Sequence, residues 1–328
     1  MSLTAFVSGA SGFVGSNLVR ELHAQDWTVH LLARTNSSLD EIEGLPYTVH
    51  PGDITDRDSL VKAMPKNTDA VFHVAASTNF WARHNTAQDL VNIDGTRNMI
   101  EVASDAGARR FIHTSSFTTW GFRDTELSEE SPRTETTDWI NYVRSKHLAE
   151  EIVLDAAGEA QIEAVVLNPA HILGPGDQHN WSRMIRMVHQ GKMLAAPPGS
   201  GNFCDVREIA KAHIQAFHRG RNGEKYLLGG EYAAFVDVVK TVGDVVGRRV
   251  PGWAAPAWIM KAWAYANTTM AALTGREPDI TAESAAMVSY HVACDSTKAR
   301  RELDYQFTPI RKLIEDTVDW MNEKGMLS

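Results

Sequence analysis

Short apolar runs alternate with helical patterns along the first half of the chain. Residues 4–8 form a short apolar run that ends at Gly9, and Val14, Leu18 and Leu22 then recur at helical spacing. Further apolar runs are found at 28–33, 70–76, 111–114 and 164–167, and further helical patterns at 90–106 and 142–156. Strands that alternate with helices predict an α/β fold, a doubly wound parallel sheet of the Rossmann type.

The pattern changes after Pro169. Residues 174–177 and 196–201 carry loop signals, whereas 205–217 is typical of a helix and 226–228 of one more strand. Tryptophan-rich, helical patterns with few strand signals follow from Glu231 onward. We therefore expect a sheet domain formed by residues 1–170 and 205–230. A smaller, mostly helical subdomain is expected from residues 171–204 and 231–328.

The most apolar segment, residues 254–273, is not expected to span a membrane. Pro256, Lys261 and Asn267 interrupt it, and a transmembrane helix needs about 20 consecutive apolar residues. One helical stripe is formed by Ile259, Trp263, Ala266, Met270 and Leu273. This stripe favours a packed helix or the wall of a substrate pocket over an anchor on a membrane surface.

A glycine-rich turn, Gly9-Ala10-Ser11-Gly12-Phe13-Val14-Gly15, joins the first strand to the first helix. Glycine lets a ligand approach the main chain, and the helix N-terminus favours negative charge, so the turn suits a diphosphate. The strand-helix-strand unit around it is that of a dinucleotide site. The spacing is G-x-x-G-x-x-G rather than G-x-G-x-x-G, and a tight turn without a ligand remains an alternative for this motif alone.

A second set of residues raises the case for a dinucleotide enzyme. Tyr142 and Lys146 stand at i and i+4 on one helix face, and Ser115-Ser116 follows the strand at 111–114. A serine, a tyrosine and a lysine beside a nucleotide fold can move protons. Because parallel strands place their carboxyl ends at one edge, the glycine turn and the serine pair should share that edge with residues 75–77 and 168–169.

Composition excludes several other functions. The chain has 328 residues, 43% hydrophobic and 22% charged, and its net charge of −9 argues against nucleic acid as a partner. Cys204 and Cys294 lie far apart, and the 13 histidines are scattered, so no metal site is expected. The first strand begins almost at once, without a signal-peptide pattern, which predicts a cytoplasmic protein.

The motifs together resemble those of the extended short-chain dehydrogenase/reductase family. The match is to its branch of dihydroflavonol 4-reductases and 3β-hydroxysteroid dehydrogenases, and it runs from the N-terminus to about residue 230. It is carried by GASGFVG at 9–15, GDITD at 52–56, HVAAS at 73–77, TSS at 114–116, YVRSK at 142–146, NPAHILGPGD at 168–177 and DVREIA at 205–210. The larger predicted domain then becomes the dinucleotide-binding domain, and the smaller one the substrate-binding subdomain.

The resemblance implies three catalytic residues. Tyr142 would be the general acid for a carbonyl oxygen, Lys146 would also bind the nicotinamide ribose, and Ser116, in preference to Ser115, would orient the substrate. A free phenol titrates near 10. An ammonium about 4 Å away contributes roughly 4 kcal/mol at an effective dielectric of 20, or about three pK units, so we expect a Tyr142 pKa near 7.

Arg34 predicts NADP(H) rather than NAD(H). An NAD enzyme places an acidic residue about 20 residues past the glycines, where this chain has Arg34 and no carboxylate before Asp40. A guanidinium there suits a 2′-phosphate, and a surface arginine is the alternative. The other cofactor contacts implied by the resemblance are Gly9, Ser11, Gly12, Phe13, Val14, Gly15, Asp53, Ile54, Ala75, Ala76, Ser77, Thr114, Tyr142, Lys146, Pro169 and Ile172.

The substrate site is predicted from aromatic residues near the same edge. Its expected lining is Trp81, Trp120, His171 and Trp181, with Phe80, Phe122 and Phe203 beside them. Such a lining favours an apolar, ring-bearing ketone or secondary alcohol, although any one of these rings could belong to the core.

Two other functions remain open. A nucleotide-sugar epimerase or dehydratase with tightly bound NAD would use the same tyrosine and glycine turn, with Arg183, Arg186 and Lys192 as a clamp for the diphosphate. A non-catalytic NADP-binding sensor would keep the fold but has no need of Tyr142. Family members often pair through the helix that carries the tyrosine, so the resemblance is also compatible with a homodimer.

Overall fold

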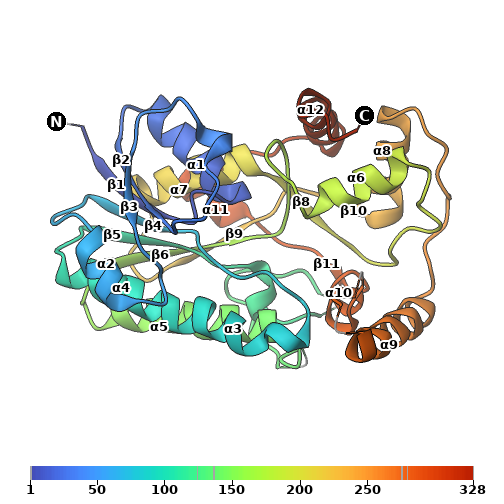
Figure 1. Ribbon diagram of the computed structural model, residues 1–328, viewed down its shortest axis with the longest axis horizontal. Coiled ribbons are helices and arrows are strands. Elements are labelled where there is room, and N and C mark those ends of the chain that lie inside the picture. Colours follow the sequence, from blue (N-terminus) through green and yellow to red (C-terminus); the bar gives the residue numbers. More distant parts are fainter. Residues whose placement is uncertain (1, 124, 136, 275, 279, 328) are drawn as a thin grey trace.

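The structure is a computed structural model, and it describes residues 2–123, 125–135, 137–274, 276–278 and 280–327. A seven-stranded parallel sheet occupies the left-hand part of the molecule in Figure 1. Its strands are β1 (Thr4–Ser8), β2 (Thr28–Ala33), β3 (Thr48–Pro51), β4 (Ala70–His73), β5 (Arg110–Thr114), β6 (Glu163–Pro169) and β9 (Lys225–Leu228). They run in the order β3-β2-β1-β4-β5-β6-β9, which confirms the predicted α/β fold. Strand order reverses at β1, where the glycine turn begins.

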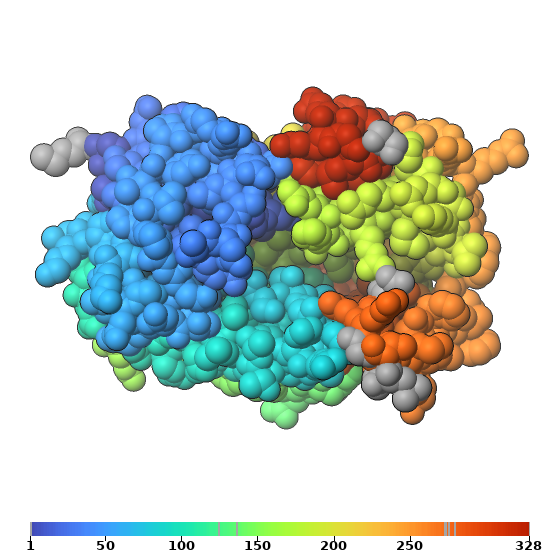
Figure 2. All heavy atoms as spheres, viewed as in Figure 1, coloured from blue at the N-terminus to red at the C-terminus, as the bar shows by residue number. Residues whose placement is uncertain are grey.

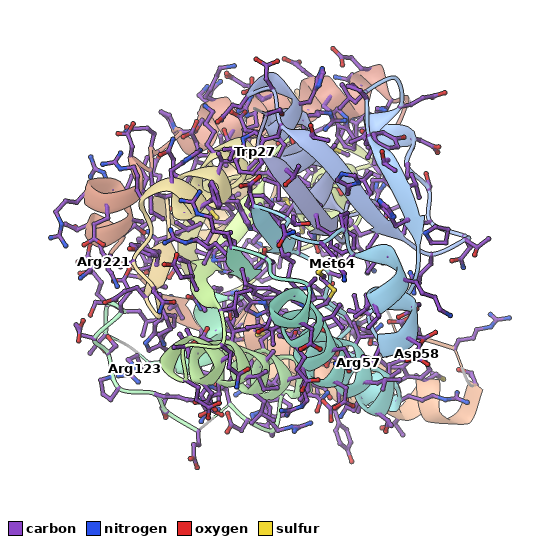
Figure 3. All side chains as sticks on the ribbon, turned by 90° about the vertical axis from the view of Figure 1, so that its left-hand side faces the viewer. Trp27, Arg57, Asp58, Met64, Arg123 and Arg221 are labelled. Atoms are coloured by element: carbon purple, nitrogen blue, oxygen red, sulfur yellow. The ribbon has the colours of Figure 1, made fainter. Side chains whose placement is uncertain are left out.

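Helices cover both faces of this sheet (Figure 1). One layer holds α1 (Phe13–Ala24), α7 (Val206–Arg219) and α11 (Thr297–Leu303), and the other holds α2 (Arg57–Ala63), α4 (Gly95–Asp105) and α5 (Asn141–Gly158). In the first layer Trp27 packs against Phe72 and Phe217. In the second, Arg57 of α2 pairs with Asp105 of α4 at 2.8 Å. Trp27 and Arg57, labelled in Figure 3, therefore belong to opposite layers.

The predicted strands and helices of the first half are confirmed within a few residues. Strands β1 and β2 have the expected bounds, whereas β4 ends at His73 rather than at residue 76. Short elements lie between the main ones: η1 (Asp40–Ile42), η2 (Ala82–His84), α3 (Asn85–Asp89), the π-helical η3 (Leu90–Asp94) and η4 (Phe117–Trp120). The edge strand β3 was not predicted, because its half-exposed Thr-Val-His-Pro sequence carries little apolar signal.

A second sheet forms beside the carboxyl ends of the first. Its strands are β7 (His171–Leu173), β8 (Ser200–Asp205), β10 (Glu231–Ala234) and β11 (His291–Val292). Strand β8 pairs with the other three, antiparallel to β10 and parallel to β7 and β11. The predicted loop at 196–201 was therefore wrong at its end, because β8 begins at Ser200 and every residue of β8 is buried.

Helices accompany this second sheet, and one of them lies differently from its sequence prediction. They are α6 (Trp181–His189), α8 (Phe235–Val245), α9 (Ala257–Thr274), α10 (Ala282–Met287) and α12 (Ile310–Glu323). The predicted stripe of α9 does not face the core, since Ile259 is 43% exposed, Trp263 62% and Met270 64%. Among the described residues, no helix is long and apolar enough to cross a membrane.

Candidate active site

The glycine turn brings the main chain of two strand ends into close contact. Gly9 has a φ of +79°, and a Cβ there would lie 2.6 Å from the backbone nitrogen of Ala75. A Cβ on Gly15 would lie 2.1 Å from the Gly9 carbonyl oxygen. Side chains at these two positions would push the turn away from the helix and from the loop after β4. The sequence therefore needs glycine at both positions for the turn to close.

Helix α1 begins directly after the glycine turn. Its N-cap is Gly12, which has no side chain to bond the first N–H groups of the helix, and Ser11 and Gly12 are exposed. Phe13 and Val14 are half-buried and begin the apolar face. Free N–H groups at a helix N-terminus, together with the helix dipole, form a site for an anionic group.

The loop after β4 carries Ala75, Ala76 and Ser77 past the glycine turn. Asn92, from the π-helical turn η3, accepts a hydrogen bond from the Ser77 N–H at 2.7 Å and donates to the Ser77 carbonyl oxygen at 3.0 Å. Its amide also donates to Ser145 Oγ on α5 at 3.0 Å. Asn92 thus ties this loop to the helix that carries Tyr142. Sequence reasoning missed Asn92, because an asparagine in a helical pattern gives no signal of such a contact.

Ser116, rather than Ser115, faces the tyrosine. The Ser116 side chain lies beside the Tyr142 phenol and lowers its pKa, and Ser116 Oγ accepts the Thr118 hydroxyl at 3.0 Å. Ser115 turns the other way and donates to Glu150 Oε2 at 2.7 Å. The structure therefore separates the two serines, and the one that contacts Tyr142 is the one preferred from the sequence.

Tyr142 and Lys146 lie one turn apart on α5, as predicted. The ring of Tyr142 packs edge-on against Phe80 with centroids 5.3 Å apart. Lys146 is 3% exposed, and its ammonium donates to the Thr114 carbonyl oxygen at 2.6 Å. The Thr114 hydroxyl is bonded to His213 at 2.7 Å, so Thr114 meets Lys146 through its main chain.

The expected pKa of Tyr142 near 7 is not found in the protein alone. Burial raises the pKa of Tyr142 above its ordinary value, and the hydrogen bond from Ser116 offsets only part of that shift. Burial lowers the pKa of Lys146 to about 8, which the negative charge of Glu150 partly opposes. Tyr142 is therefore a protonated phenol at neutral pH, and Lys146 keeps most of its charge.

Glu150 is a buried carboxylate beneath these residues, and sequence reasoning missed it. It is 2% exposed and lies one turn beyond Lys146 on α5. Its Oε2 accepts hydrogen bonds from Ser115 and from Asn168 Nδ2, the latter at 2.6 Å. Its Oε1 pairs with the Lys225 ammonium at 3.0 Å. A glutamate in an amphipathic helix is typical of a solvated face, so only the fold reveals this network.

The residues predicted to bind the adenosine differ in how available their side chains are to a ligand. Arg34 is exposed at the end of β2. The Asp53 carboxylate already accepts the Thr55 N–H at 2.9 Å and hydroxyl at 2.8 Å, so it closes a turn. Ile54 is buried, and a Cβ on Gly95 would lie 2.8 Å from its side chain. Ile54 can therefore offer a ligand mainly its backbone, whereas the second carboxylate oxygen of Asp53, Oδ2, takes no part in this turn.

His171 stands in a cluster of aromatic rings beside the second sheet. It begins β7, two residues after Pro169 ends β6, and Ile172 comes next on β7. Its ring lies 5.3 Å from Phe117 and 5.6 Å from Trp181. Burial lowers the pKa of His171 to about 4, so this side chain is neutral at pH 7.

Trp120 does not line a pocket, which corrects its predicted role. It is 1% exposed, and the Lys225 ammonium lies 3.8 Å from its ring centroid. Phe122 is buried as well and stacks on Tyr290 at 4.4 Å. Trp81 and Trp181 are half-buried, as residues near an opening would be. The surface is hollowed between the N-terminal part of the molecule and the segments of the second sheet (Figure 2).

The fold and this arrangement define a class of protein, the nicotinamide-dependent oxidoreductases. Residues 5–229 match the model of the NAD dependent epimerase/dehydratase family. A putative dihydroflavonol 4-reductase from Synechocystis is 30% identical over 98% of this chain and 95% of its own length. Sterol demethylase protein B of Methylococcus capsulatus is 31% identical over 99% and 100%. The crystal structure of gox2253 has a TM-score of 0.84 and 31% identity, with 100% of both chains covered.

The chain therefore belongs to the NAD dependent epimerase/dehydratase family. Within it, the chain lies in the extended short-chain dehydrogenase/reductase branch, as its motifs predicted. It is an enzyme of that superfamily, and the cofactor of the family is a nicotinamide dinucleotide.

Proposed function

We propose that this protein is an NADP(H)-dependent oxidoreductase that interconverts a ketone and a secondary alcohol on an apolar, ring-bearing small molecule. One observation carries the proposal: Ser116 lies beside the Tyr142 phenol, and the buried Lys146 lies one helical turn away on α5. A donor phenol beside a hydroxyl and a buried cation matches the needs of a carbonyl oxygen that gains negative charge.

The residues at the glycine turn fit a dinucleotide. A side chain at Gly9 or Gly15 would fill the space beside the turn, and the exposed backbone at Gly12 offers N–H groups to a diphosphate. The exposed guanidinium of Arg34 suits the extra phosphate of NADP. When bound, the nicotinamide supplies or accepts the hydride.

The chain's own residues handle the proton. In the reduction, Ser116 would orient the substrate oxygen and Tyr142 would donate its phenolic proton to that oxygen. The tyrosinate that remains would be stabilised by the Lys146 ammonium, whose charge also suits the ribose hydroxyls of the cofactor. In the oxidation, the same tyrosinate would take the proton back.

The lining of the substrate side supports an apolar ring as the substrate's body. His171 is uncharged at neutral pH, and Trp81 and Trp181 add large, half-buried aromatic surfaces. Such surfaces bind flat apolar molecules and give little to a charged one. The names of the dihydroflavonol 4-reductase and sterol demethylase relatives are in keeping with such a substrate.

A second candidate, nucleotide-sugar epimerisation or dehydration, is favoured by the family description itself. It would use the same tyrosine, with a dinucleotide that stays bound. The two functions differ in what they consume, because a reductase oxidises NADPH stoichiometrically and an epimerase needs no added cofactor.

The test is the exchange Tyr142→Phe in the full chain. We expect it to lower ketone-dependent NADPH oxidation by about 10²- to 10⁴-fold, the usual contribution of a general acid, with NADPH binding nearly unchanged. A panel of aromatic ketones, followed at the nicotinamide absorbance, measures turnover, and titration of cofactor fluorescence measures binding.

The matched control is Tyr265→Phe, which removes an exposed hydroxyl on α9 and should leave turnover unchanged. Full activity in Tyr142→Phe would contradict the assigned acid. Conversion of UDP- or GDP-sugars without added cofactor, in a protein inert toward ketones, would establish the epimerase instead.

A further inference from the structure

Helix α9 presents its large apolar side chains to solvent and its small ones to the protein. Ala264 is fully buried and Ala271 is 4% exposed, so these two residues, seven positions apart, mark the covered face of α9, which also contacts α10. On the other side, Trp258 is 70% exposed and Tyr265 75%. A helix of an ordinary globular protein has the opposite arrangement. The exposed aromatic rings of α9 therefore form a surface suited to contact with another molecule.

The exposed apolar side chains cover a broad, convex part of this helix. With 100° between successive residues, they span an arc of about 160° from Tyr265 to Trp263. The members of this outer arc, in order around the helix, are Tyr265, Trp258, Thr269, Ala262, Ala266, Ile259, Met270 and Trp263. Helix α9 stands at one corner of the molecule, next to α10 (Figure 1). A rigid, flat partner cannot touch all of a convex arc, but a fluid medium can.

The charge of this segment is opposite to that of the whole chain. Residues 247–276 contain Arg248, Arg249, Lys261 and Arg276 and no acidic residue, although the net charge of the chain is −9. Lys261 lies at the margin of the arc and Arg276 follows the end of α9. Neither side chain forms an ion pair within the described part of the structure. Both charges are therefore available to an anionic surface.

We propose that the outer arc of α9 binds the surface of an anionic lipid bilayer. Tryptophan and tyrosine rings favour the boundary between lipid headgroups and acyl chains, and nearby basic residues attract anionic lipids. The helix would lie in the interface without crossing it. A second copy of this chain is a poorer occupant, because two copies of α9 would bring like charges together.

The position of α9 would place a bound bilayer beside the expected substrate opening. Just beyond the helix, Glu277 accepts a hydrogen bond from Asn79 Nδ2 at 2.9 Å, and Asn79 belongs to the loop that carries Trp81. A bilayer bound at α9 would therefore lie beside the expected substrate opening, where an apolar molecule dissolved in lipid could enter. This route of entry rests on the proposed function, whereas the binding of α9 to lipid does not.

The test is co-sedimentation of the full chain with lipid vesicles. We expect binding to vesicles of phosphatidylcholine mixed with phosphatidylglycerol, weaker binding to phosphatidylcholine alone, and a decrease with added salt. Replacing Trp258 and Trp263 together by serine should weaken binding by at least tenfold, and Lys261→Glu should remove the preference for the anionic vesicles. The matched control is Trp139→Ser, which removes a tryptophan that is 54% exposed and does not belong to α9.

None of these binding measurements depends on turnover of a substrate. An unchanged thermal midpoint in the variants shows that they are folded, since the replaced side chains are exposed. No binding of the wild-type chain to either vesicle, or equal loss in the Trp139→Ser control, would overturn the proposal. Light scattering that shows a dimer in the wild type and a monomer in the double variant would assign the arc to a second copy instead.

Discussion

In the proposed function, Arg34 is the residue that selects NADP(H) over NAD(H). It is exposed at the end of β2, and the next acidic residue along the chain is Asp40. A guanidinium forms paired, charge-assisted hydrogen bonds with a phosphate, and it offers nothing comparable to the ribose hydroxyl of NAD.

We predict that Arg34→Ala reduces the preference for NADPH over NADH by about tenfold or more, since a charge-assisted hydrogen bond contributes about 1.5–3 kcal/mol. The expected change is a higher KM for NADPH with kcat and the KM for NADH nearly unchanged. Steady-state kinetics with both cofactors measure it. Arg219→Ala, which removes an exposed arginine at the end of α7, is the matched control. Equal use of the two cofactors by the wild-type chain would contradict this role of Arg34.

The sequence predicted which side chains form the candidate site, but it did not predict the pKa of Tyr142. Tyr142, Lys146 and Ser116 could be predicted because motif spacing fixes their identity, and they do come together. The pKa of Tyr142 could not be predicted, because it depends on how deeply the phenol is buried. The spacing of two residues along the chain gives no information about burial. Glu150 escaped notice for the same reason: its partners come from strands far away in the chain.

Glu150 of helix α5 connects the candidate site to the central sheet. Its carboxylate raises the pKa of Lys146 against the effect of burial, which alone would lower it further. Its hydrogen bonds to Ser115 and Asn168 also hold the chain next to Ser116. In the proposed function, Glu150 would therefore be a positioning residue that acts through Lys146 and Ser116.

We predict that Glu150→Gln shifts the alkaline limb of the pH–rate profile for ketone reduction to lower pH. Without the carboxylate, the pKa of Lys146 falls below about 8, so its ammonium is lost earlier as the pH rises. The profile of kcat against pH measures this shift. Glu151→Gln, which changes the exposed neighbour on the same helix, should leave the profile in place. A uniform loss of activity at every pH would show a merely structural role.

At the element scale, hydrophobic periodicity predicted the central sheet but not the second one. Apart from the edge strand β3, the strands of the central sheet are mostly buried, so they are continuous apolar runs. Strand β8 reads Ser-Gly-Asn-Phe-Cys-Asp, and it is a strand because three neighbours pair with it. For α9, periodicity predicted the helix correctly, but it could not tell which face the protein would cover.

Asp205 joins the two sheets of the whole molecule. It ends β8 and is the N-cap of α7, where its carboxylate accepts the Arg207 N–H at 2.9 Å. The same carboxylate accepts the Thr308 hydroxyl at 2.9 Å, and Arg207 continues to Asp316 of α12 at 2.7 Å. One buried side chain thus connects the second sheet, a helix of the first sheet and the C-terminal segment.

We predict that Asp205→Ala lowers the free energy of unfolding by about 3 kcal/mol, because it removes a helix cap and charge-assisted hydrogen bonds. Urea denaturation measures this as a lower midpoint with an unchanged slope. Asp237→Ala, which removes an exposed carboxylate of α8, should change stability by less than about 0.5 kcal/mol. Equal effects of the two exchanges would contradict the account of Asp205.

The interleaved connections of the two sheets also set the order in which they can assemble on the ribosome. All strands of the seven-stranded sheet have been synthesised once the chain reaches Leu228. Val292, which pairs with Gly201 of β8, follows more than sixty residues after Leu228. Until then β8 lacks one of its neighbours, and an unpaired strand edge invites aggregation. We therefore expect the nascent chain to pass through a stage in which the first sheet is formed while β8 still has an open edge.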